Sequence, residues 1–440
     1  MVYLLYDLIL LLASLILVPY YAFRGVRSGT LRQGIGERLG RIPPAKLSLL
    51  VRRQVFWIHA VSVGETRAAV PLVKGLKKAY PDVALVLSSV TETGHEIASN
   101  LSQVDCCLFF PFDFSWVVRR VLAAIRPELI IIVETEIWPN FVRLADEQNI
   151  PVVLVNGRIS DRSFPRYRRF RWFLRRILER FSLLCMQTDQ DAKRIQLMGA
   201  PKELVHVSGN MKFDLGDILP GANIQAVKER YQLPDDALIW IAGSTHAGEE
   251  EEVVAAYQQL LAEGKKLFLV LVPRHPNRCK GVGEMLRQRG ISFARRSELP
   301  VTASFLAAGT VLLMDTVGEL QKLYGVADVV FVGGSLVPVG GHNLLEASAV
   351  KKPVLFGPQM HNFKEISRLL LEAGGGLMVA DGNELFTVMG RLLDSPAERY
   401  ELGERGYQVV ARHAGATALT IDLIRSVLTQ DAADHNAAID

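Results

Sequence analysis

The chain has 440 residues, which is enough for two or three domains. Apolar residues make up 49% of it and charged residues 22%, and this balance excludes a largely disordered protein. Residues 1–216 hold 29 Lys and Arg against 19 Asp and Glu, a formal charge of +10, whereas residues 217–440 hold 21 against 27, a charge of −6. A basic half joined to an acidic half is not a uniform nucleic-acid coat, so we expect one half to meet an anionic surface or substrate.

The N-terminal segment has the composition of a membrane-anchoring helix. Residues 2–22 are apolar over about the length that a helix needs to cross the hydrocarbon core, and Asp7 is their only charge. Residues 1–23 contain no Lys or Arg, so the cationic start of a secretory signal is missing. Arginines follow from Arg24 to Arg41, and the positive-inside rule places the rest of the chain in the cytoplasm. Because of Asp7, a helix lying on the membrane is an alternative to one that spans it.

From residue 54 onward, apolar runs typical of strands alternate with helical patterns. The runs are continuous rather than alternating, as in strands buried on both faces of a parallel sheet. They are residues 55–61, 84–90, 129–135, 151–157 and 183–189, then 237–244, 267–274, 311–316, 328–334 and 353–358. A polar segment rich in Pro and Gly near residue 215 separates the two sets.

This pattern predicts an α/β fold of two facing Rossmann-like domains, with ligands bound in a cleft at the carboxyl ends of the strands. We expect a membrane anchor helix over residues 1–23, an N-terminal domain over 24–215, a C-terminal domain over 216–400 and a helical tail over 401–440.

The motif HAVSVGE (59–65) places Glu65 at the end of a strand and on the first turn of a helix. Glu65 is a candidate general base. The alternative is a carboxylate that complements the helix dipole. The tight turn at Ser62 and Gly64 also offers backbone N–H groups that could hold an anion.

Two further motifs of the N-terminal half add charged groups. ETEIWPN (134–140) ends a strand with Glu134 and Glu136, which would share a face if the strand continued. SGNMKFD (208–214) carries Lys212, which could offset negative charge on a substrate. The alternatives are a helix cap for one of the acids and a solvated loop lysine.

Four loops of the second half follow four successive strands. They are residues 242–251, 272–278, 315–320 and 333–349. The last is glycine-rich, so a ligand could approach its backbone closely, and the helix start at Asn343 would attract phosphate. A Glu one turn into that helix, Glu346, could bind ribose hydroxyls. Together the loops predict a nucleotide site.

Neither the cysteines nor the histidines form a disulfide or metal-binding pattern. The four cysteines are too few and too irregularly spaced, so we expect them to be reduced and mostly buried. The spacings of His59, His246, His275 and His342 match no HExxH motif or facial triad. We therefore expect these histidines to be hydrogen-bonded or tightly packed, with no bound metal.

Residues 158–180 hold nine arginines interleaved with aromatic and aliphatic residues. RNA binding is one interpretation, and contact with anionic lipid is another. A third is a helix packed on the sheet with a solvated arginine face. Given the N-terminal segment, we favour contact with the membrane or with an acidic acceptor, with the packed helix as an equal alternative.

A family resemblance rests on six motifs taken in order. They are HAVSVGE (59–65), PFDFSWVVRRVLAAIRPELIIIVETEIWPN (111–140), SGNMKFD (208–214), GSTHAGEEE (243–251), VPRHPNR (272–278) and GGHNLLE (340–346). Together with the N-terminal anchor they resemble the 3-deoxy-D-manno-octulosonic acid (Kdo) transferases of Gram-negative bacteria. The resemblance implies the two-domain GT-B glycosyltransferase fold, CMP-Kdo as donor and the lipid A precursor lipid IVA as acceptor, in lipopolysaccharide assembly on the cytoplasmic face of the inner membrane.

The resemblance also implies inversion of the anomeric centre, no bound metal or other cofactor, and no nucleic-acid partner. The implied general base is Glu65. Glu136 or Glu134 would support the transition state, and Lys212 matches the family's catalytic lysine. The implied donor contacts are Pro273, Arg274, Val317, Gly318, Glu319, Asn343, Leu344, Leu345 and Glu346.

Overall fold

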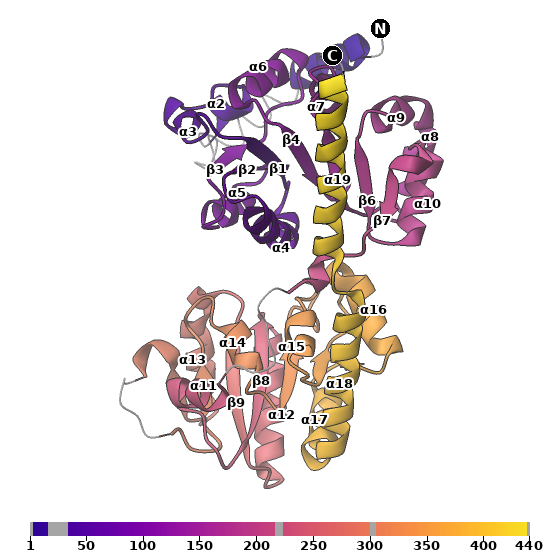
Figure 1. Ribbon diagram of the computed structural model, residues 1–440. Helices are drawn as coiled ribbons and strands as arrows, with labels where there is room; N and C mark the ends of the chain where they lie inside the picture. Colours follow the sequence, from indigo (N-terminus) through magenta and orange to yellow (C-terminus); the bar gives the residue numbers. More distant parts are fainter. Residues whose placement is uncertain (1–2, 16–33, 216–222, 300–304, 438–440) are drawn as a thin grey trace. The chain divides into compact units, whose positions relative to one another are not determined.

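The computed structural model describes residues 3–15, 34–215, 223–299 and 305–437 (Figure 1). The chain forms two compact units: unit 1 comprises residues 1–214 and 414–440, and unit 2 comprises residues 215–413. Each unit is built around its own parallel β-sheet, and helices flank each sheet. The fold class is therefore α/β with two Rossmann-like sheets.

The sheet of unit 1 has seven parallel strands in the order β3-β2-β1-β4-β5-β6-β7. They are β1 (Val55–His59), β2 (Ala84–Ser89), β3 (Cys106–Phe109), β4 (Leu129–Val133), β5 (Val152–Gly157), β6 (Leu183–Met186) and β7 (Val205–Val207). The register places Phe56 of β1 beside Leu85 on one side and Leu129 on the other. Every residue of the five inner strands is buried, which explains their largely apolar sequences.

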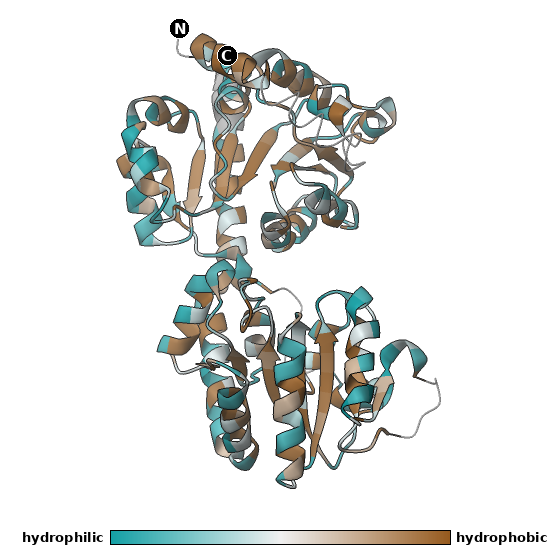
Figure 2. Ribbon diagram, turned by 180° about the vertical axis from the view of Figure 1, so that it is seen from behind, coloured by the Kyte–Doolittle hydropathy of each residue, from teal (hydrophilic) through white to brown (hydrophobic). Residues whose placement is uncertain are grey.

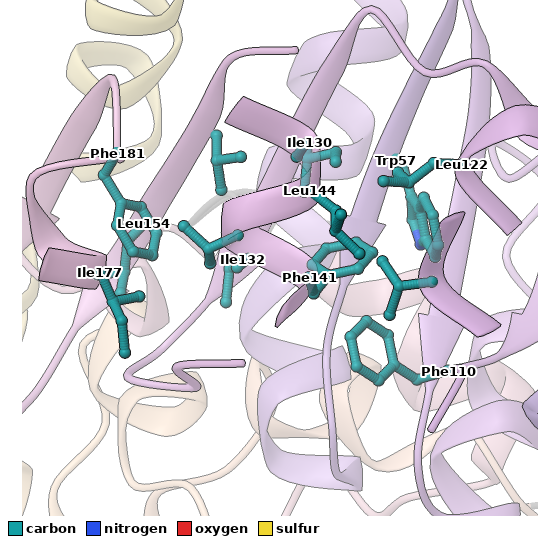
Figure 3. Packing of buried hydrophobic residues seen from close by; sticks show 14 of the residues in the cluster. Trp57, Phe110, Leu122, Ile130, Ile132, Phe141, Leu144, Leu154, Ile177 and Phe181 are labelled. Atoms are coloured by element: carbon teal, nitrogen blue, oxygen red, sulfur yellow. The ribbon is translucent and has the colours of Figure 1, made fainter. Parts of the chain in front are cut away.

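Helices of unit 1 cover both faces of this sheet. They are α2 (Ile35–Arg38), α3 (Pro44–Ser48), α4 (Val63–Ala79), α5 (Glu92–Ser99), α6 (Ser115–Ile125), α7 (Pro139–Asp146), α8 (Phe164–Arg169), α9 (Arg171–Leu178), α10 (Asp189–Met198) and α19 (Ala416–Ala437), with 3-10 turns η1 (Lys202–Leu204) and η2 (Met211–Phe213). On one face Trp57 and Ile132 pack with Phe141 of α7 (Figure 3). On the other face α4 and α19 pack on the remaining strand residues.

The last helix returns to unit 1 after the chain has completed unit 2. The Asp214 carboxylate accepts the backbone N–H groups of Gly415 (2.6 Å) and Thr417 (2.5 Å) at the start of α19. Ile421 and Ile424 of α19 then join the core around α4. The tail expected over residues 401–440 is therefore not one separate piece, because its first part belongs to unit 2 and α19 to unit 1.

The sheet of unit 2 has seven parallel strands in the order β10-β11-β9-β8-β12-β13-β14. They are β8 (Leu238–Thr245), β9 (Leu267–Pro273), β10 (Phe293–Arg295), β11 (Val311–Leu313), β12 (Val329–Val332), β13 (Val354–Phe356) and β14 (Gly376–Met378). The helices are α11 (Ile224–Tyr231), α12 (Glu249–Ala262), α13 (Cys279–Gln288), α14 (Leu320–Tyr324), α15 (Leu345–Ala349), α16 (Lys364–Glu372), α17 (Gly382–Asp394) and α18 (Pro396–His413), with 3-10 turns η3 (Pro276–Arg278), η4 (Arg296–Glu298) and η5 (His361–Phe363). Figure 2 shows strongly hydrophobic strands between helices of mixed character.

Each sheet has a point at its centre where the strand order reverses. In unit 1 it falls between β1 and β4, and in unit 2 between β8 and β12. The helix after β1, α4, packs on one face of the sheet, whereas α7, after β4, packs on the other. Loops diverge at such a switch point, and the carboxyl ends of its two strands border the usual ligand crevice of open α/β sheets.

All ten strands predicted from the sequence are present, with ends that differ by up to three residues. The four strands that the sequence pattern missed, β3, β7, β10 and β14, are the edge strands of the two sheets. They are three or four residues long, and each includes at least one residue that is not buried. A short edge strand lacks the long apolar run by which the inner strands were recognised.

Residues 3–15 form a helix that packs against unit 1. The Tyr6 hydroxyl donates to Asp113 (3.1 Å), and Asp7 accepts from the Ser115 hydroxyl (2.5 Å) and the Asn140 side-chain amide (2.7 Å). The single charge of the N-terminal segment therefore has polar partners in the folded unit. Among the described residues, no helix has both the length and the apolar character to cross a membrane. Residues 16–23 of the expected anchor lie outside the described residues.

Replacing Phe141 with alanine should destabilise unit 1 by about 3–5 kcal/mol, because it opens a cavity beside Trp57 and Phe110. The control is Phe170→Ala, since Phe170 is 55% exposed. Urea unfolding followed by circular dichroism measures both variants. Equal stability of the two variants would contradict the central position of Phe141 in this core.

Candidate active site

Glu65 is the third residue of α4, the helix that follows the carboxyl end of β1 after a short turn. Its carboxylate accepts hydrogen bonds from the backbone N–H of Val61 (2.6 Å) and from the Ser62 hydroxyl (3.0 Å). This geometry resembles a capping box, so Glu65 does complement the helix start. The sequence predicted that backbone N–H groups of this turn could bind an anion. One of them, the N–H of Val61, is instead bonded to Glu65. The same bonds hold the carboxylate at the switch point.

The chain turns sharply between β4 and α7, where Glu134 and Glu136 lie. The strand ends at Val133, and Glu134 has a left-handed backbone conformation with φ of 61°. The two acids therefore do not share a strand face. A left-handed conformation costs a residue other than glycine roughly 1–2 kcal/mol, and such outliers gather at functional sites.

Glu65, Glu134 and Glu136 act on one another through their charges. Burial raises the pKa of Glu136 to about 7, and the carboxylates of Glu65 and Glu134 add to the shift. Burial also raises the pKa of Glu65. The hydrogen bond from Val61 opposes that shift, the negative charge of Glu134 adds to it, and the positive charge of Lys212 lowers it. The structure thus brings together all four catalytic candidates of the N-terminal half.

Lys212 lies on η2 and balances part of this negative charge. Its Nζ is 3.3 Å from Oε1 of Glu134. The η2 turn is held by two asparagines: Asn156, at the end of β5, accepts the N–H of Met211 (3.0 Å), and Asn210 accepts the N–H of Lys212 (3.0 Å). Lys212 is therefore an anchored cation rather than a solvated loop lysine.

This group of side chains is suited to proton transfer. A carboxylate whose pKa is raised toward neutrality is an effective general base near neutral pH. No hydrogen-bond or ion-pair partner is found for the Glu136 carboxyl in the part of the chain that the structure describes. Glu134, in contrast, is paired with Lys212. The two glutamates that the sequence could not separate thus have different surroundings.

His59 takes no part in this group. Its side chain is fully buried, Nδ1 lies 3.1 Å from the Ser88 hydroxyl, and the ring stacks on Phe110 with centroids 3.7 Å apart. Burial lowers the pKa of His59 to about 3, so the ring is neutral at physiological pH. Hydrogen bonding and tight packing, expected from the sequence, are both confirmed for this histidine.

The donor-binding candidates of the C-terminal half follow the strands of unit 2. Pro273 ends β9, and Arg274 comes directly after it, with its N–H bonded to the carbonyl of Thr245 (2.9 Å). Asn343 accepts the N–H of Leu345 (3.1 Å) and donates to Glu346 (3.2 Å). The side chains of Leu344 and Leu345 are fully buried, so a ligand could reach these residues only through their backbone.

The segment with Val317, Gly318 and Glu319 lies after β11. The Val317 side chain is 80% exposed, and Gly318 has a left-handed backbone with φ of 83°. Burial acts to raise the pKa of Glu319, but hydrogen bonds from Tyr231 and Arg296 outweigh it and lower the pKa. Arg296 Nε is 3.0 Å from the Glu319 carboxylate. Neither partner could be recognised from a local sequence pattern, because both lie far from Glu319 along the chain.

The sequence also missed the role of Glu249, one of a run of acids that begins α12. Its fully buried carboxylate accepts four backbone N–H groups. These belong to His246 (3.0 Å), Gly334 (2.6 Å), Ser335 (2.9 Å) and Leu336 (2.8 Å). The start of the glycine-rich loop is therefore bound by a carboxylate of the protein, so those N–H groups are not free to bind a ligand.

Within the described ranges, no three His, Cys, Asp or Glu side chains are arranged as ligands for one metal ion. The four cysteines are free, and Cys106, Cys185 and Cys279 are buried.

Replacing Glu136 with glutamine should stabilise the protein more at pH 8 than at pH 5. The pKa of Glu136 is raised to about 7 in the fold, so the native carboxyl is neutral at pH 5, like the amide. At pH 8 the fold must hold the charged form, which burial disfavours. Thermal unfolding at both pH values measures the difference, with the exposed Glu128→Gln as control. An equal gain at both pH values would refute the raised pKa.

Comparison with known proteins finds relatives over most of the chain. Residues 33–215 match the family model described as 3-Deoxy-D-manno-octulosonic-acid transferase (kdotransferase). The 3-deoxy-D-manno-octulosonic acid transferase of Haemophilus influenzae is 36% identical over 438 residues, which cover 97% of this chain and 99% of the relative.

Two solved structures are also similar. UDP-GlcNAc 2-epimerase from Neisseria meningitidis bound to UDP-GlcNAc is 13% identical, with a TM-score of 0.57 over 85% of this chain and 100% of that one, and this likeness concerns the fold alone. The C-terminal CMP-Kdo binding domain of WaaA from Acinetobacter baumannii is 30% identical over 42% of this chain and 95% of that chain, with a TM-score of 0.39. By its identity to the Haemophilus relative over nearly its whole length, this chain belongs to the Kdo transferase family and is a glycosyltransferase.

Proposed function

We propose that this glycosyltransferase moves Kdo from CMP-Kdo to a hydroxyl of lipid IVA, with inversion at the anomeric carbon and with Glu65 as general base. Membership of the Kdo transferase family supports the transferred sugar. The observation that carries the proposal for the base is the group of carboxylates at the β1–β4 switch point. There burial raises the pKa of Glu65, and the negative charge of Glu134 adds to the shift.

The reaction is a single displacement. The acceptor hydroxyl oxygen attacks the anomeric carbon of Kdo, and its proton passes to the Glu65 carboxylate. The bond between that carbon and the phosphate oxygen of CMP breaks, and its electron pair leaves with CMP. Because the two oxygens lie on opposite faces of the carbon, the configuration inverts. A raised pKa makes Glu65 a stronger base than an ordinary glutamate.

Glu136, Glu134 and Lys212 would support this step electrostatically. Glu136, whose pKa is about 7, can lie near the positive charge that develops at the anomeric carbon. Lys212, held by its bond to Glu134, can offset the carboxylate or phosphate of the donor. Glu134 is paired with Lys212, whereas no such partner is found for Glu136 among the described residues, and this favours Glu136 over Glu134 as the group that supports the transition state.

The donor would bind to the strand-end loops of unit 2. Arg274 offers a positive charge for the phosphate, and Glu346 and Glu319 offer carboxylates for ribose hydroxyls. Glu319 is already bonded to Arg296, so it would bind a hydroxyl as part of an ion pair. Pro273, Val317, Gly318 and Asn343 border the same loops, and Leu344 and Leu345 could contribute backbone groups.

The acceptor is a lipid, and the helix of residues 3–15 offers a surface suited to a membrane. Tyr6 and Asp7 face unit 1, whereas an apolar row faces away from it. The exposed side chains of that row are Leu4, Leu5, Leu8, Ile9, Leu11, Leu12 and Leu15. We therefore infer that this helix lies in the interface of the inner membrane on its cytoplasmic side, as interfacial amphipathic helices do.

Side chains next to this helix fit the same orientation. Two exposed tryptophans lie close to it. Trp116, 58% exposed, follows Ser115, which bonds to Asp7. Trp172, 60% exposed, precedes Phe173, which packs against Tyr6. Tryptophan is enriched at membrane interfaces.

The arginine-rich stretch of residues 158–180 is partly a packed helix, because Leu174, Ile177 and Leu178 of α9 are buried. Its exposed arginines are Arg158, Arg162, Arg166, Arg168, Arg169, Arg171, Arg175 and Arg176, and they could attract anionic lipid.

Incubation of the enzyme with lipid IVA and a series of donors tests the overall function. We expect turnover with CMP-Kdo and little with UDP-sugars. Efficient use of a UDP-sugar, with none of CMP-Kdo, would refute the proposed donor.

Glu65→Gln should lower kcat by about 10²–10⁴-fold, the usual contribution of a general base, while CMP still binds. Glutamine can still accept the N–H of Val61, so the helix start is preserved. The matched control is Glu92→Gln, since Glu92 begins α5 after the neighbouring strand β2. Near-normal turnover of Glu65→Gln would show that another group accepts the proton.

The double substitution Leu8→Glu and Ile9→Glu should weaken binding to vesicles that contain phosphatidylglycerol by at least tenfold, because burial of one such side chain contributes about 1.5–3 kcal/mol. Leu371→Glu, at a 39% exposed position of unit 2, is the control. Cosedimentation measures the bound fraction. Unchanged binding of the double variant would place the membrane contact elsewhere.

A further inference from the structure

Three histidines gather at the switch point of unit 2. His246 follows β8, His275 follows β9, and His342 lies in the glycine-rich loop after β12. The Nε2 atoms of His246 and His342 are 2.9 Å apart, and the two rings are nearly parallel, at 5°. The ring of His275 stands edge-on to His246, with centroids 5.8 Å apart. The spacing of these histidines matches no metal-binding motif, and it did not predict that their rings contact one another.

A bond between two Nε2 atoms requires one proton. One ring donates its N–H and the other accepts it, so both rings cannot be protonated at Nε2 while the bond is intact. If a second proton is added, the bond opens and two N–H donors become available side by side. An anion with several acceptor oxygens, such as a phosphate, is the natural ligand for two such donors.

The pair is built into the fold rather than being a chance contact. Glu249 accepts the backbone N–H of His246 and three N–H groups from the first part of the glycine-rich loop, so one buried carboxylate ties both histidine-bearing loops together. Gly334 has a left-handed backbone, and a Cβ there would lie 2.9 Å from the ring of His342. A side chain at that position would displace the ring.

Charged groups of both signs lie near the pair. Burial lowers the pKa of His246, Glu249 opposes the shift, and Arg274 and Arg278 add to it. A protonated His246 ring is therefore disfavoured without a bound anion, and a phosphate beside it would oppose that effect. The charged and titratable groups near it are Glu249, Glu250, Arg274, His275 and Arg278, with His361 beside Gly340 of the same loop.

Both histidines are half-buried, so a ligand can reach them. They also belong to the loops that carry the proposed donor contacts Arg274 and Asn343. We propose that His246 and His342 bind the phosphate of the cytidine nucleotide through their Nε2–H groups, with the bond between them opening and one proton entering from solvent. This inference rests on the proposed function, because it takes the nucleotide from there.

The proton balance of binding tests the proposal. Titration calorimetry of the wild-type protein with CMP at pH 7.5, in two buffers of different ionisation enthalpy, should show uptake of up to one proton. The phosphate of CMP, with a pKa of about 6, is already mostly ionised at this pH, so the proton goes to the protein. Affinity for CMP should fall as the pH rises from 6.5 to 8.5. Cytidine, which lacks the phosphate, should show neither effect.

His342→Gln should bind CMP roughly ten- to a hundredfold more weakly at pH 6.5, the effect expected from a lost hydrogen bond to a charged group. It should also lose the proton uptake, while its affinity for cytidine stays the same and shows that the unit is folded. The control is His413→Gln, since His413 bonds to Val409 of its own helix.

The outcomes separate the two proposals. If the wild-type protein binds neither CMP nor cytidine, the proposed donor site is wrong, and this inference falls with it. If the wild-type protein binds CMP without proton uptake, or if His342→Gln keeps both the affinity and the pH dependence, the donor site stands and the role of the histidine pair is refuted.

Discussion

The constraint on unit 1 is that it holds three carboxylates at one edge of a buried sheet. Glu65 and the Glu134–Glu136 turn follow the two strands between which the sheet order reverses, so their loops border one crevice. Like charges in partly buried positions resist ionisation, and the fold limits this cost with one lysine and with hydrogen bonds to Glu65. The result is a carboxylate whose basicity is raised by its position, which is what the proposed reaction needs.

Unit 2 uses the corresponding edge of its sheet differently. At the β8–β12 switch point the positive charges are those of Arg274 and Arg278. Arg278 is paired with the buried Glu250, and the carboxylate of Glu249 accepts backbone N–H groups. The formal charges of the two halves, +10 and −6, do not show this local arrangement, because the C-terminal half, for which we propose donor binding, is acidic overall. The basic surface of the first half agrees with an anionic lipid acceptor, whereas the donor would be bound by a few local groups.

Sequence patterns predicted the inner strands of both sheets and the strand-end positions of Glu65, Glu134 and Glu136, and they singled out Lys212 as a cation of the same half. They succeeded because a strand buried on both faces must be apolar throughout, and because functional groups of α/β sheets follow the strands. The edge strands lack that apolar pattern and were missed. The turn at Glu134, the anchoring role of Glu249 and the bond between His246 and His342 depend on contacts between residues distant along the chain, or on a single backbone angle, and no local pattern records these.

The central claim is that Glu65 is the base and that its neighbours raise its pKa. The most direct test is the dependence of kcat/KM on pH for Kdo transfer by the wild-type enzyme and by Glu134→Gln. The negative charge of Glu134 raises the pKa of Glu65, so its removal should lower that pKa. The acidic limb of the profile should therefore move to lower pH in the variant. An acidic limb that stays in place, or moves to higher pH, would contradict the assignment of Glu65 as the base.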